Sequence, residues 1–319
     1  MTLYDLIIIG AGPSGLACAI EAKKKGLSVL VLDKGAVADA IRRFPIDMTF
    51  FSTPELLAIG GVPFTTAGFR PTRVECVRYY QMISKYFDLS VEQDVEVVEI
   101  RPQVGSFEVI SAKESYKAKN VVDATGYFDH PNNFDVPGSD LPKVRRYYDE
   151  PYGYFGKDVA VIGGKNSAVE TALDLFRNGA RVTLIHRRKT LDHGIKYWIL
   201  PDIENRIKSG EIRALFETTV VRVSEAAIAV EGDHPEELPN DAVFVMIGYC
   251  PDTTLLRKAG VEIDSDSQAP VHNPETMETN VKGLFVAGSI AAGKFNNKIF
   301  IENGRMHGEL IVKTVTHSR

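Results

Sequence analysis

The sequence predicts an α/β protein with two Rossmann-like dinucleotide-binding domains, the second inserted into the first. Three observations support this fold class: a glycine-rich turn after an apolar run near residue 10, a second unit of the same kind near residue 163, and another apolar strand near the C-terminus. A chain of 319 residues exceeds the usual size of one domain. Two domains, each with its own core, are therefore expected.

The first unit begins with an apolar run at residues 6–9 that meets Gly10. A helix-like segment at 16–22 follows, and a second apolar run at 29–32 then reaches Asp33. This order predicts a strand, a turn, a helix and a second strand.

The same order recurs at residues 159–162, 167–176 and 181–185, with Gly163 at the turn. Strands that are apolar throughout are typical of a parallel sheet covered on both faces. The repeat therefore predicts a βαβ unit in each domain.

Two crossings between the domains are expected. The first follows residues 121–126, where Pro131, Pro137 and Pro142 interrupt regular structure, and the second follows an apolar strand at 244–249. We expect one domain to comprise residues 1–127 and 247–319, and the other residues 128–246. A strand at 283–288 and a helix from Ile299 to Thr316 are expected to close the chain.

Composition excludes several classes of partner. A hydrophobic fraction of 44%, a charged fraction of 25%, a formal net charge of -5 and a pI near 5.9 give no reason to expect nucleic acid or an anionic membrane. The N-terminus lacks the basic start and long apolar region of a signal peptide, and no segment is long enough to span a bilayer. We expect a cytoplasmic protein.

Three cysteines, Cys18, Cys76 and Cys250, lie far apart and form no CxxC. They predict neither a disulfide framework nor a zinc site, and we predict no metal site. Buried thiols are the expected state of all three.

The turn Gly10-Ala11-Gly12-Pro13-Ser14-Gly15 is a complete GxGxxG between a predicted strand and helix. Gly10 permits the tight turn, Gly12 lets the backbone approach a pyrophosphate, and Gly15 lets the helix pack on the strand. Asp33, at the end of the next strand, supplies a carboxylate for ribose hydroxyls. The motif predicts an ADP-containing cofactor, and FAD is our assignment.

The second turn, Gly163-Gly164-Lys165-Asn166-Ser167-Ala168, carries lysine in place of the middle glycine. The helix N-terminus and Lys165 can hold a pyrophosphate, with Gly163, Asn166 and Ser167 beside it. A solvated turn lysine is the alternative.

Basic residues replace the acidic ribose reader in the second unit. His186, Arg187 and Arg188 follow its second strand, and guanidinium groups bind phosphate in pairs of hydrogen bonds. We therefore predict NADPH rather than NADH. As a bare charge run, the cluster would be a solvated face.

These motifs, with Ala124-Thr125-Gly126 and the C-terminal Leu284-Phe285-Val286-Ala287-Gly288, resemble the low-molecular-weight thioredoxin-reductase superfamily over essentially the whole chain. The resemblance implies FAD in the split domain and NADPH in the inserted one. We place these further residues at the FAD: Lys34, Val95, Thr125, Gly126, Gly288, Ser289, Lys298 and Ile299.

Thioredoxin reductases carry a redox CxxC shortly before the second fingerprint. Here that region, residues 145–152, contains no cysteine. Electron relay through a protein dithiol requires thiols, so an ordinary thioredoxin reductase is excluded.

Three stretches look like the YpdA-type flavoproteins, the bacillithiol-disulfide reductases: residues 163–168, 196–207 and 299–305. That resemblance implies NADPH-dependent reduction of a low-molecular-weight disulfide by a homo-oligomer. Many members have cysteine where this chain has Ser14. Cys18, one helical turn further on, is the candidate substitute, but helix packing is expected to bury it.

The favoured mechanism is hydride transfer to flavin and delivery of two electrons to an acceptor, so we name no catalytic residue. Ser289 stands where thioredoxin reductases place an aspartate on the ribityl chain, and Asn297-Lys298-Ile299 is expected to open the last helix beside the flavin. Cations that could assist departing thiolates, or be merely solvated, are Lys294, Lys298, Arg305, Arg145 and Arg146.

Two alternatives remain at this point. A ferredoxin- or flavodoxin-NADP reductase shares the architecture and passes electrons to a small redox protein. A flavin-bearing sensor or binding protein with vestigial activity is the other alternative. The sequence does not identify the thiol.

Overall fold

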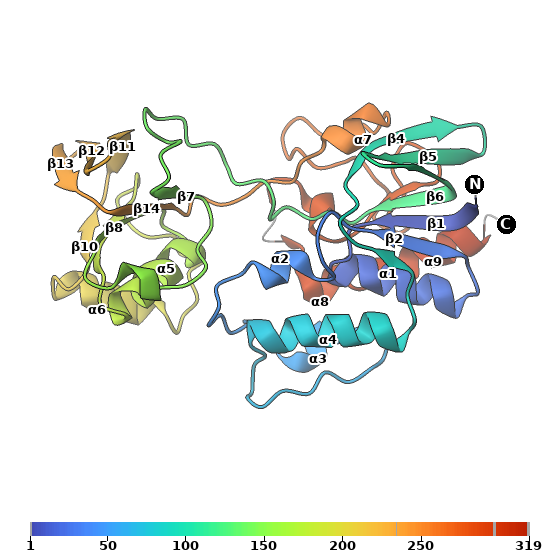
Figure 1. The fold of residues 1–319 in the computed structure, drawn as a ribbon, viewed down its shortest axis with the longest axis horizontal. Coiled ribbons are helices and arrows are strands. Elements are labelled where there is room, and N and C mark those ends of the chain that lie inside the picture. The colour runs from blue at the N-terminus through green and yellow to red at the C-terminus, as the bar shows by residue number, and fades with distance from the viewer. Residues whose placement is uncertain (1, 234, 296–297, 318–319) are drawn as a thin grey trace. The chain divides into compact units, whose positions relative to one another are not determined.

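The computed structural model describes residues 2–233, 235–295 and 298–317. Contacts divide the chain into two compact units, residues 1–130 with 249–319 and residues 131–248 (Figure 1). These divisions fall a few residues from the expected boundaries. Which cofactor each unit binds stays a prediction.

The first unit is built on a mixed sheet of order β3-β2-β1-β6-β5-β4, with β15 paired to β6. Strands β3, β2, β1, β6 and β15 run parallel, whereas β5 and β4 are antiparallel additions. The strand bounds are β1 Leu3–Ile9, β2 Val29–Leu32, β3 Val91–Glu92, β4 Val97–Gln103, β5 Ser106–Ser111, β6 Ser115–Asp123 and β15 Leu284–Val286.

The helices of this unit are α1 Pro13–Lys24, α2 Asp39–Arg42, α3 Pro54–Leu57, α4 Arg73–Tyr86, α7 Thr254–Lys258, α8 Ile301–Gly304 and α9 His307–His317, with a 3-10 turn at Gly288–Ala292. Helix α1 contacts β1, β2 and α9 (Figure 1). A Cβ on Gly308 would lie 2.9 Å from the Cys18 backbone, so α9 packs closely on α1. The helix that follows the first glycine turn is therefore covered by the C-terminal helix.

The second unit has a parallel sheet of order β10-β9-β8-β14-β7. A separate antiparallel sheet, β11-β12-β13, supplies a second apolar cluster against it. The bounds are β7 Val144–Arg145, β8 Asp158–Ile162, α5 Asn166–Arg177, β9 Arg181–Ile185, α6 Leu200–Lys208, β10 Arg213–Leu215, β11 Thr218–Val223, β12 Ala227–Gly232, β13 Glu236–Pro239 and β14 Ala242–Val245, with a 3-10 turn at Tyr152–Tyr154.

The two predicted strand–helix–strand units are confirmed, and the bounds of β2 and β9 match the apolar runs. Two other predictions were wrong. The strand expected at 244–249 is β14, which ends at Val245, because the chain turns away through Gly248 at a φ of +91°. The single helix expected from Ile299 to Thr316 is two helices, separated at Arg305 and Met306.

Candidate cofactor sites

The first glycine turn is shaped by close backbone contacts. Gly10 has a φ of +109°, and a Cβ there would lie 2.5 Å from the carbonyl oxygen of Ala124. A Cβ on Gly15 would lie 2.0 Å from the carbonyl oxygen of Gly10. Around Gly12, by contrast, a Cβ would meet nothing within 4 Å. Helix α1 starts at Pro13 without a side-chain cap, so its first turn faces this space with donors for an anion.

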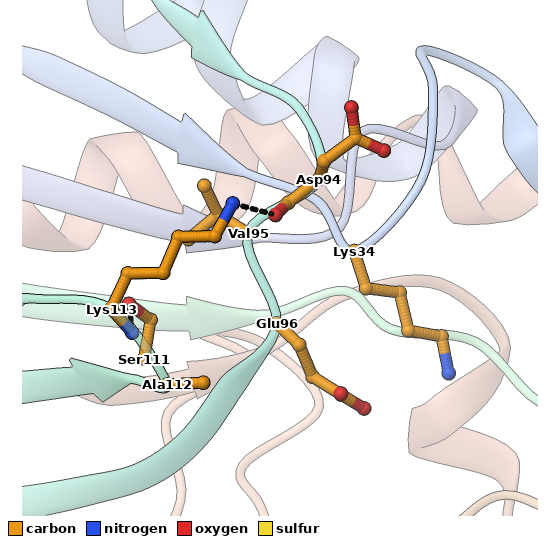
Figure 2. A pocket seen from close by; sticks show the side chains of 7 residues that line it. All are labelled: Lys34, Asp94, Val95, Glu96, Ser111, Ala112 and Lys113. Atoms are coloured by element: carbon orange, nitrogen blue, oxygen red, sulfur yellow. Dashed lines mark hydrogen bonds between the residues drawn. The ribbon is translucent and has the colours of Figure 1, made fainter.

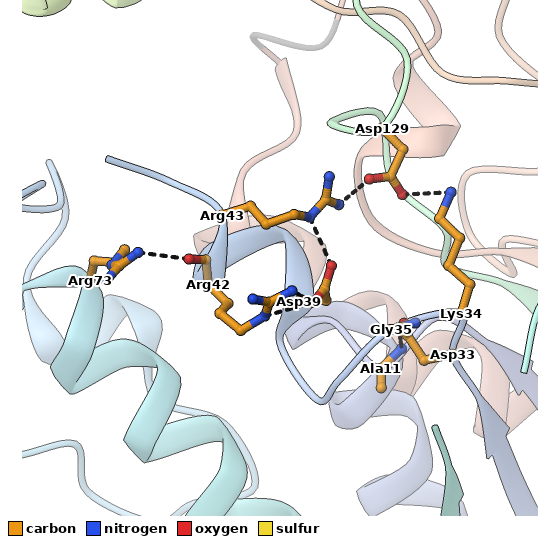
Figure 3. A network of polar contacts seen from close by, with 9 residues as sticks. All are labelled: Ala11, Asp33, Lys34, Gly35, Asp39, Arg42, Arg43, Arg73 and Asp129. Atoms are coloured by element: carbon orange, nitrogen blue, oxygen red, sulfur yellow. Dashed lines mark hydrogen bonds and ion pairs between the residues drawn. The ribbon is translucent and has the colours of Figure 1, made fainter. Parts of the chain in front are cut away.

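The Asp33 carboxylate is held beside this turn. Its Oδ2 accepts a hydrogen bond of 2.6 Å from the backbone N–H of Ala11, and its Oδ1 accepts one of 2.8 Å from Gly35 (Figure 3). Burial raises the pKa of Asp33, and the two backbone hydrogen bonds oppose that rise. Each oxygen keeps a lone pair for a ribose hydroxyl, so turn and carboxylate fit the ADP moiety of FAD.

A cavity of about 330 Å³ adjoins the same strand end and is lined by Lys34, Asp94, Val95, Glu96, Ser111, Ala112 and Lys113 (Figure 2). The backbone N–H of Val95 donates to the carbonyl oxygen of Asp33 at 2.9 Å, which fixes the cavity beside the ribose-binding carboxylate. Its volume suits a nucleotide base. Residues 111–113, which line the cavity from the turn after β5, were not predicted here. Only the pairing of β4 with β5 brings this turn close to Val95.

Thr125, at the carboxyl end of β6, is held by Asp123. Its N–H and hydroxyl donate to Oδ1 of that carboxylate at 3.0 and 2.7 Å. Asp123 is fully buried, and its Oδ2 has no partner in the described part of the chain. Burial raises the pKa of Asp123 to about 6. The contact of Asp123 with Thr125 was not predicted, because in the sequence Asp123 is simply the last residue of an apolar strand.

The Ser14 hydroxyl lies between two glycines. A Cβ on Gly288 would be 2.7 Å from the Ser14 oxygen, and one on Gly304 would be 2.9 Å from it. Ile299 touches the same Gly304. The Gly288 N–H donates to Nδ1 of His307 at 3.1 Å. The first glycine turn and the C-terminal segment therefore pack directly against each other.

Gly126 and Ser289 also lie together, since a Cβ on Gly126 would be 3.6 Å from the Ser289 hydroxyl oxygen. This contact places Ser289 beside the end of β6. Lys298 is exposed and its ammonium lies 4.8 Å from the ring centroid of Phe295. Asn297 lies outside the described residues.

Several candidate cations are engaged elsewhere. Arg305 donates to the carbonyl oxygens of Glu55, at 3.0 Å, and of Ala58, which ties α8 to α3. Arg146 donates to the carbonyl oxygen of Asn132. The Lys294 ammonium lies 5.5 Å from the Phe295 ring centroid, and Arg145 is exposed. Arg305 and Arg146 thus bind backbone carbonyl oxygens of neighbouring segments.

The second glycine turn repeats the geometry of the first. Gly163 has a φ of +148°, and a Cβ there would lie 2.4 Å from the carbonyl oxygen of Met246. Lys165 is the exposed residue before α5, which lacks a side-chain cap, and Ser167 is exposed on the first turn. Lys165 can therefore reach an anion at this N-terminus.

Asn166 braces the loop that follows β9. Its Nδ2 donates to the carbonyl oxygen of Gly194 at 3.1 Å, and its Oδ1 accepts from the Lys196 N–H at 2.8 Å. Lys196 also pairs with Glu170 of α5 at 2.5 Å. The predicted cofactor contact of Asn166 is thus accompanied by a structural role that spacing could not show.

His186 packs on the second turn, because a Cβ on Gly164 would lie 2.3 Å from its imidazole Cε1. Burial, together with Arg188 and Arg187, lowers the pKa of His186, so the ring is neutral at pH 7. Arg187 and Arg188 are exposed, and Arg188 reaches Asp192 only at 4.0 Å. The two guanidinium groups are therefore the available phosphate ligands here.

The cysteines are free thiols: Cys18 and Cys76 are buried and Cys250 is half-buried. Burial raises the pKa of Cys18 and of Cys76 to about 12, so neither forms a thiolate at neutral pH.

Within residues 2–233, 235–295 and 298–317, no cluster of three or more His, Cys, Asp or Glu side chains could hold a metal ion. In the same ranges, every helix is too short or too polar to cross a bilayer.

Two glycine turns after parallel strands, one beside a carboxylate and the other beside a basic cluster, are typical of pyridine-nucleotide oxidoreductases with two Rossmann-like domains. The family model for pyridine nucleotide-disulphide oxidoreductase matches residues 7–288. The chain is 46% identical to the bacilliredoxin reductase Bdr of Bacillus subtilis over 95% of this chain and 94% of that protein. The chain belongs to this disulphide oxidoreductase family, within its Bdr (YpdA) group.

Solved structures have the same fold as this chain. Bacillithiol disulfide reductase Bdr (YpdA) from Bacillus cereus superposes with a TM-score of 0.97 at 41% identity, with both chains fully covered. Lactococcus lactis thioredoxin reductase shares the fold, with a TM-score of 0.81 at 19% identity and 98% of each chain covered.

Proposed function

We propose that this protein is an NADPH-dependent, FAD-containing reductase of a low-molecular-weight disulfide, bacillithiol disulfide or a close analogue. The observation that carries the proposal is the matched pair of glycine turns with Asp33 beside one and Arg187 and Arg188 beside the other. Similarity to the bacillithiol disulfide reductases supports the choice of acceptor. We further propose a cytoplasmic homo-oligomer.

Each cofactor has residues suited to hold it. Gly12, the N-terminus of α1 and Asp33 would bind the ADP part of FAD, with the base in the cavity beside Val95. Lys165, Arg187 and Arg188 would bind the phosphates of NADPH. Bound FAD supplies the two-electron carrier between nicotinamide and disulfide.

The reaction needs no thiol of the protein. NADPH and one proton convert the disulfide into two thiols, which balances two electrons. Burial supports this, because it raises the pKa of the Cys18 and Cys76 thiols to about 12 and keeps both protonated at neutral pH.

The test is steady-state oxidation of NADPH or NADH by the purified yellow protein with bacillithiol disulfide. We expect turnover with NADPH and much weaker turnover with NADH. A colourless protein that takes up no FAD would refute the proposal at the level of cofactor. Turnover of ferredoxin or flavodoxin without turnover of the small disulfide would assign the protein to electron transfer instead.

A further inference from the structure

The guanidinium of Arg43 bridges two carboxylates beside the predicted FAD site (Figure 3). Its Nε donates to Asp39 Oδ2 at 2.8 Å, and its Nη2 donates to Asp129 Oδ1. The other oxygen of Asp129 pairs with the Lys34 ammonium at 3.0 Å. The guanidinium carbon of Arg43 also lies 5.3 Å from the ring centroid of Phe128, a cation–π contact.

Both carboxylates lie close to the residue that would bind the ribose. A Cβ on Gly35, whose N–H binds Asp33, would be 2.6 Å from the carboxyl carbon of Asp39. Burial is the largest cause of the raised pKa of Asp33, and the charges of Asp39 and Asp129 add to it. Unneutralised, these two charges would oppose both ionised Asp33 and a phosphate-bearing cofactor.

The neutralising cations differ in position. Arg42 binds Asp39 at 2.7 Å, but its side chain is 57% exposed, so solvent screens it. Arg43 is 30% exposed and reaches both carboxylates, whose side chains are only 15% and 19% exposed. Although burial opposes ionisation of Asp129, its hydrogen bonds to Arg43 and Lys34 lower its pKa overall. Arg43 therefore neutralises Asp39 and Asp129 on their buried side, where solvent screens their charges least.

We propose that Arg43 is a positioning residue for FAD: by bridging Asp39 and Asp129 it neutralises the two carboxylates beside the ribose-binding carboxylate of Asp33. The inference rests on the proposed assignment of FAD to this unit. Arg43 and Lys34 together hold Asp129, Arg43 from the end of α2 and Lys34 from the end of β2. Arg43 thus acts through Asp39 and Asp129, the two carboxylates that it binds.

The test is FAD affinity of the full chain, measured by adding FAD to apoprotein and following the quenching of flavin fluorescence. Arg43→Met keeps a long unbranched side chain but removes the charge, both hydrogen bonds and the cation–π contact with Phe128, and we expect its Kd for FAD to rise on the order of tenfold. Arg42→Met removes a cation from the same Asp39 on its solvent side and is expected to stay within about twofold.

A double variant separates charge from folding. In Arg43→Met with Asp129→Asn, one of the two carboxylates that lost the Arg43 guanidinium is gone, so FAD affinity is expected to recover by at least about threefold relative to Arg43→Met. Arg43→Lys, which keeps a charge but cannot reach both partners, is expected to be intermediate. Thermal unfolding of each apoprotein records whether the fold is kept.

Two results would overturn the inference. One is a folded Arg43→Met variant that binds FAD as wild type does. The other is a double variant that binds no better than the single one. A wild-type protein that binds no FAD would instead refute the proposed function.

Discussion

The His186 imidazole lies directly on Gly164, where a Cβ would come within 2.3 Å of the ring. The first unit has the same relationship between Asp33 and Ala11, in which the carboxylate needs only the backbone N–H. Because the His186 ring is bulkier than the Asp33 carboxylate, the second turn has glycine at 164 where the first turn has Ala11. His186 stands at the position where an aspartate or glutamate binds the ribose in NAD-binding domains, but it carries no negative charge.

Gly164→Ala is expected to weaken binding of NADPH and NADH alike, because the displaced ring would disturb the turn that both share. Overpacking of this kind costs about 1–3 kcal/mol, or roughly tenfold or more in Kd. Equilibrium titration by fluorescence measures both constants. Adding His186→Ala to the variant removes the clash and should restore part of the affinity, and a Gly164→Ala protein with unchanged Kd would show that the ring moves freely.

Replacing Arg187 and Arg188 with alanine is expected to raise the KM for NADPH far more than that for NADH. Two lost charge-assisted hydrogen bonds correspond to about 3 kcal/mol, or on the order of a hundredfold. Arg181→Ala is the control, since it lies at the opposite end of β9 and pairs with Asp158. An unchanged ratio of the two KM values would make the cluster a solvated face.

Anaerobic titration is expected to bleach the flavin after about one equivalent of NADPH per FAD, since a CxxC store is absent from the sequence. Cys18→Ala should retain disulfide turnover, because burial keeps that thiol protonated. Loss of disulfide turnover in a folded variant with normal flavin reduction would contradict the mechanism and make Cys18 the relay.

The buried Asp123 predicts a specific dependence of stability on pH. Burial raises its pKa in the folded protein to about 6, above the ordinary value of 3.8 for an exposed carboxyl, so the folded state binds the proton more tightly. Its contribution to the free energy of unfolding is therefore fully present below pH 4 and is lost as pH rises from about 4 to 6.

The difference in unfolding free energy between wild type and Asp123→Asn measures this dependence. Across that pH range the difference is expected to shift by about 3 kcal/mol in favour of the variant. Denaturant unfolding at several pH values between 4 and 7 provides the test. A difference that stays constant with pH would show that Asp123 titrates normally.

The sequence was sufficient for what depends on local pattern. Apolar runs located β1, β2, β8 and β9, and a glycine turn follows β1 and β8. That these two turns bind nucleotides stays a prediction. The break between α8 and α9 follows Asn303-Gly304, a pair that is typical of turns. This local signal was present in the sequence, but the expected single helix did not take it into account.

Contacts between distant residues account for what the sequence did not reveal. Arg43 and Asp129 are 86 positions apart, and only the packing of α2 beside the end of β6 joins them. The position of the His186 ring depends on Gly164, in the turn after β8, because a Cβ there would occupy the space of the ring. Lys34 was predicted at the cofactor from its neighbour Asp33, and its ion pair with Asp129 could not be foreseen.

The contacts of Gly304 with Ser14 and of Gly308 with Cys18 are four residues apart on both segments, but they differ in kind. The bare backbone of Gly288 and Gly304 limits side-chain volume at 14, whereas the backbone of Cys18 leaves no room for a side chain at 308. Serine and cysteine are near-equal in size and both fit at 14, whereas valine or leucine would press against Gly288 and Gly304. In lineages related to this chain, substitutions at 14 should therefore be confined to small side chains for as long as 288 and 304 stay glycine, whether or not position 14 carries sulfur.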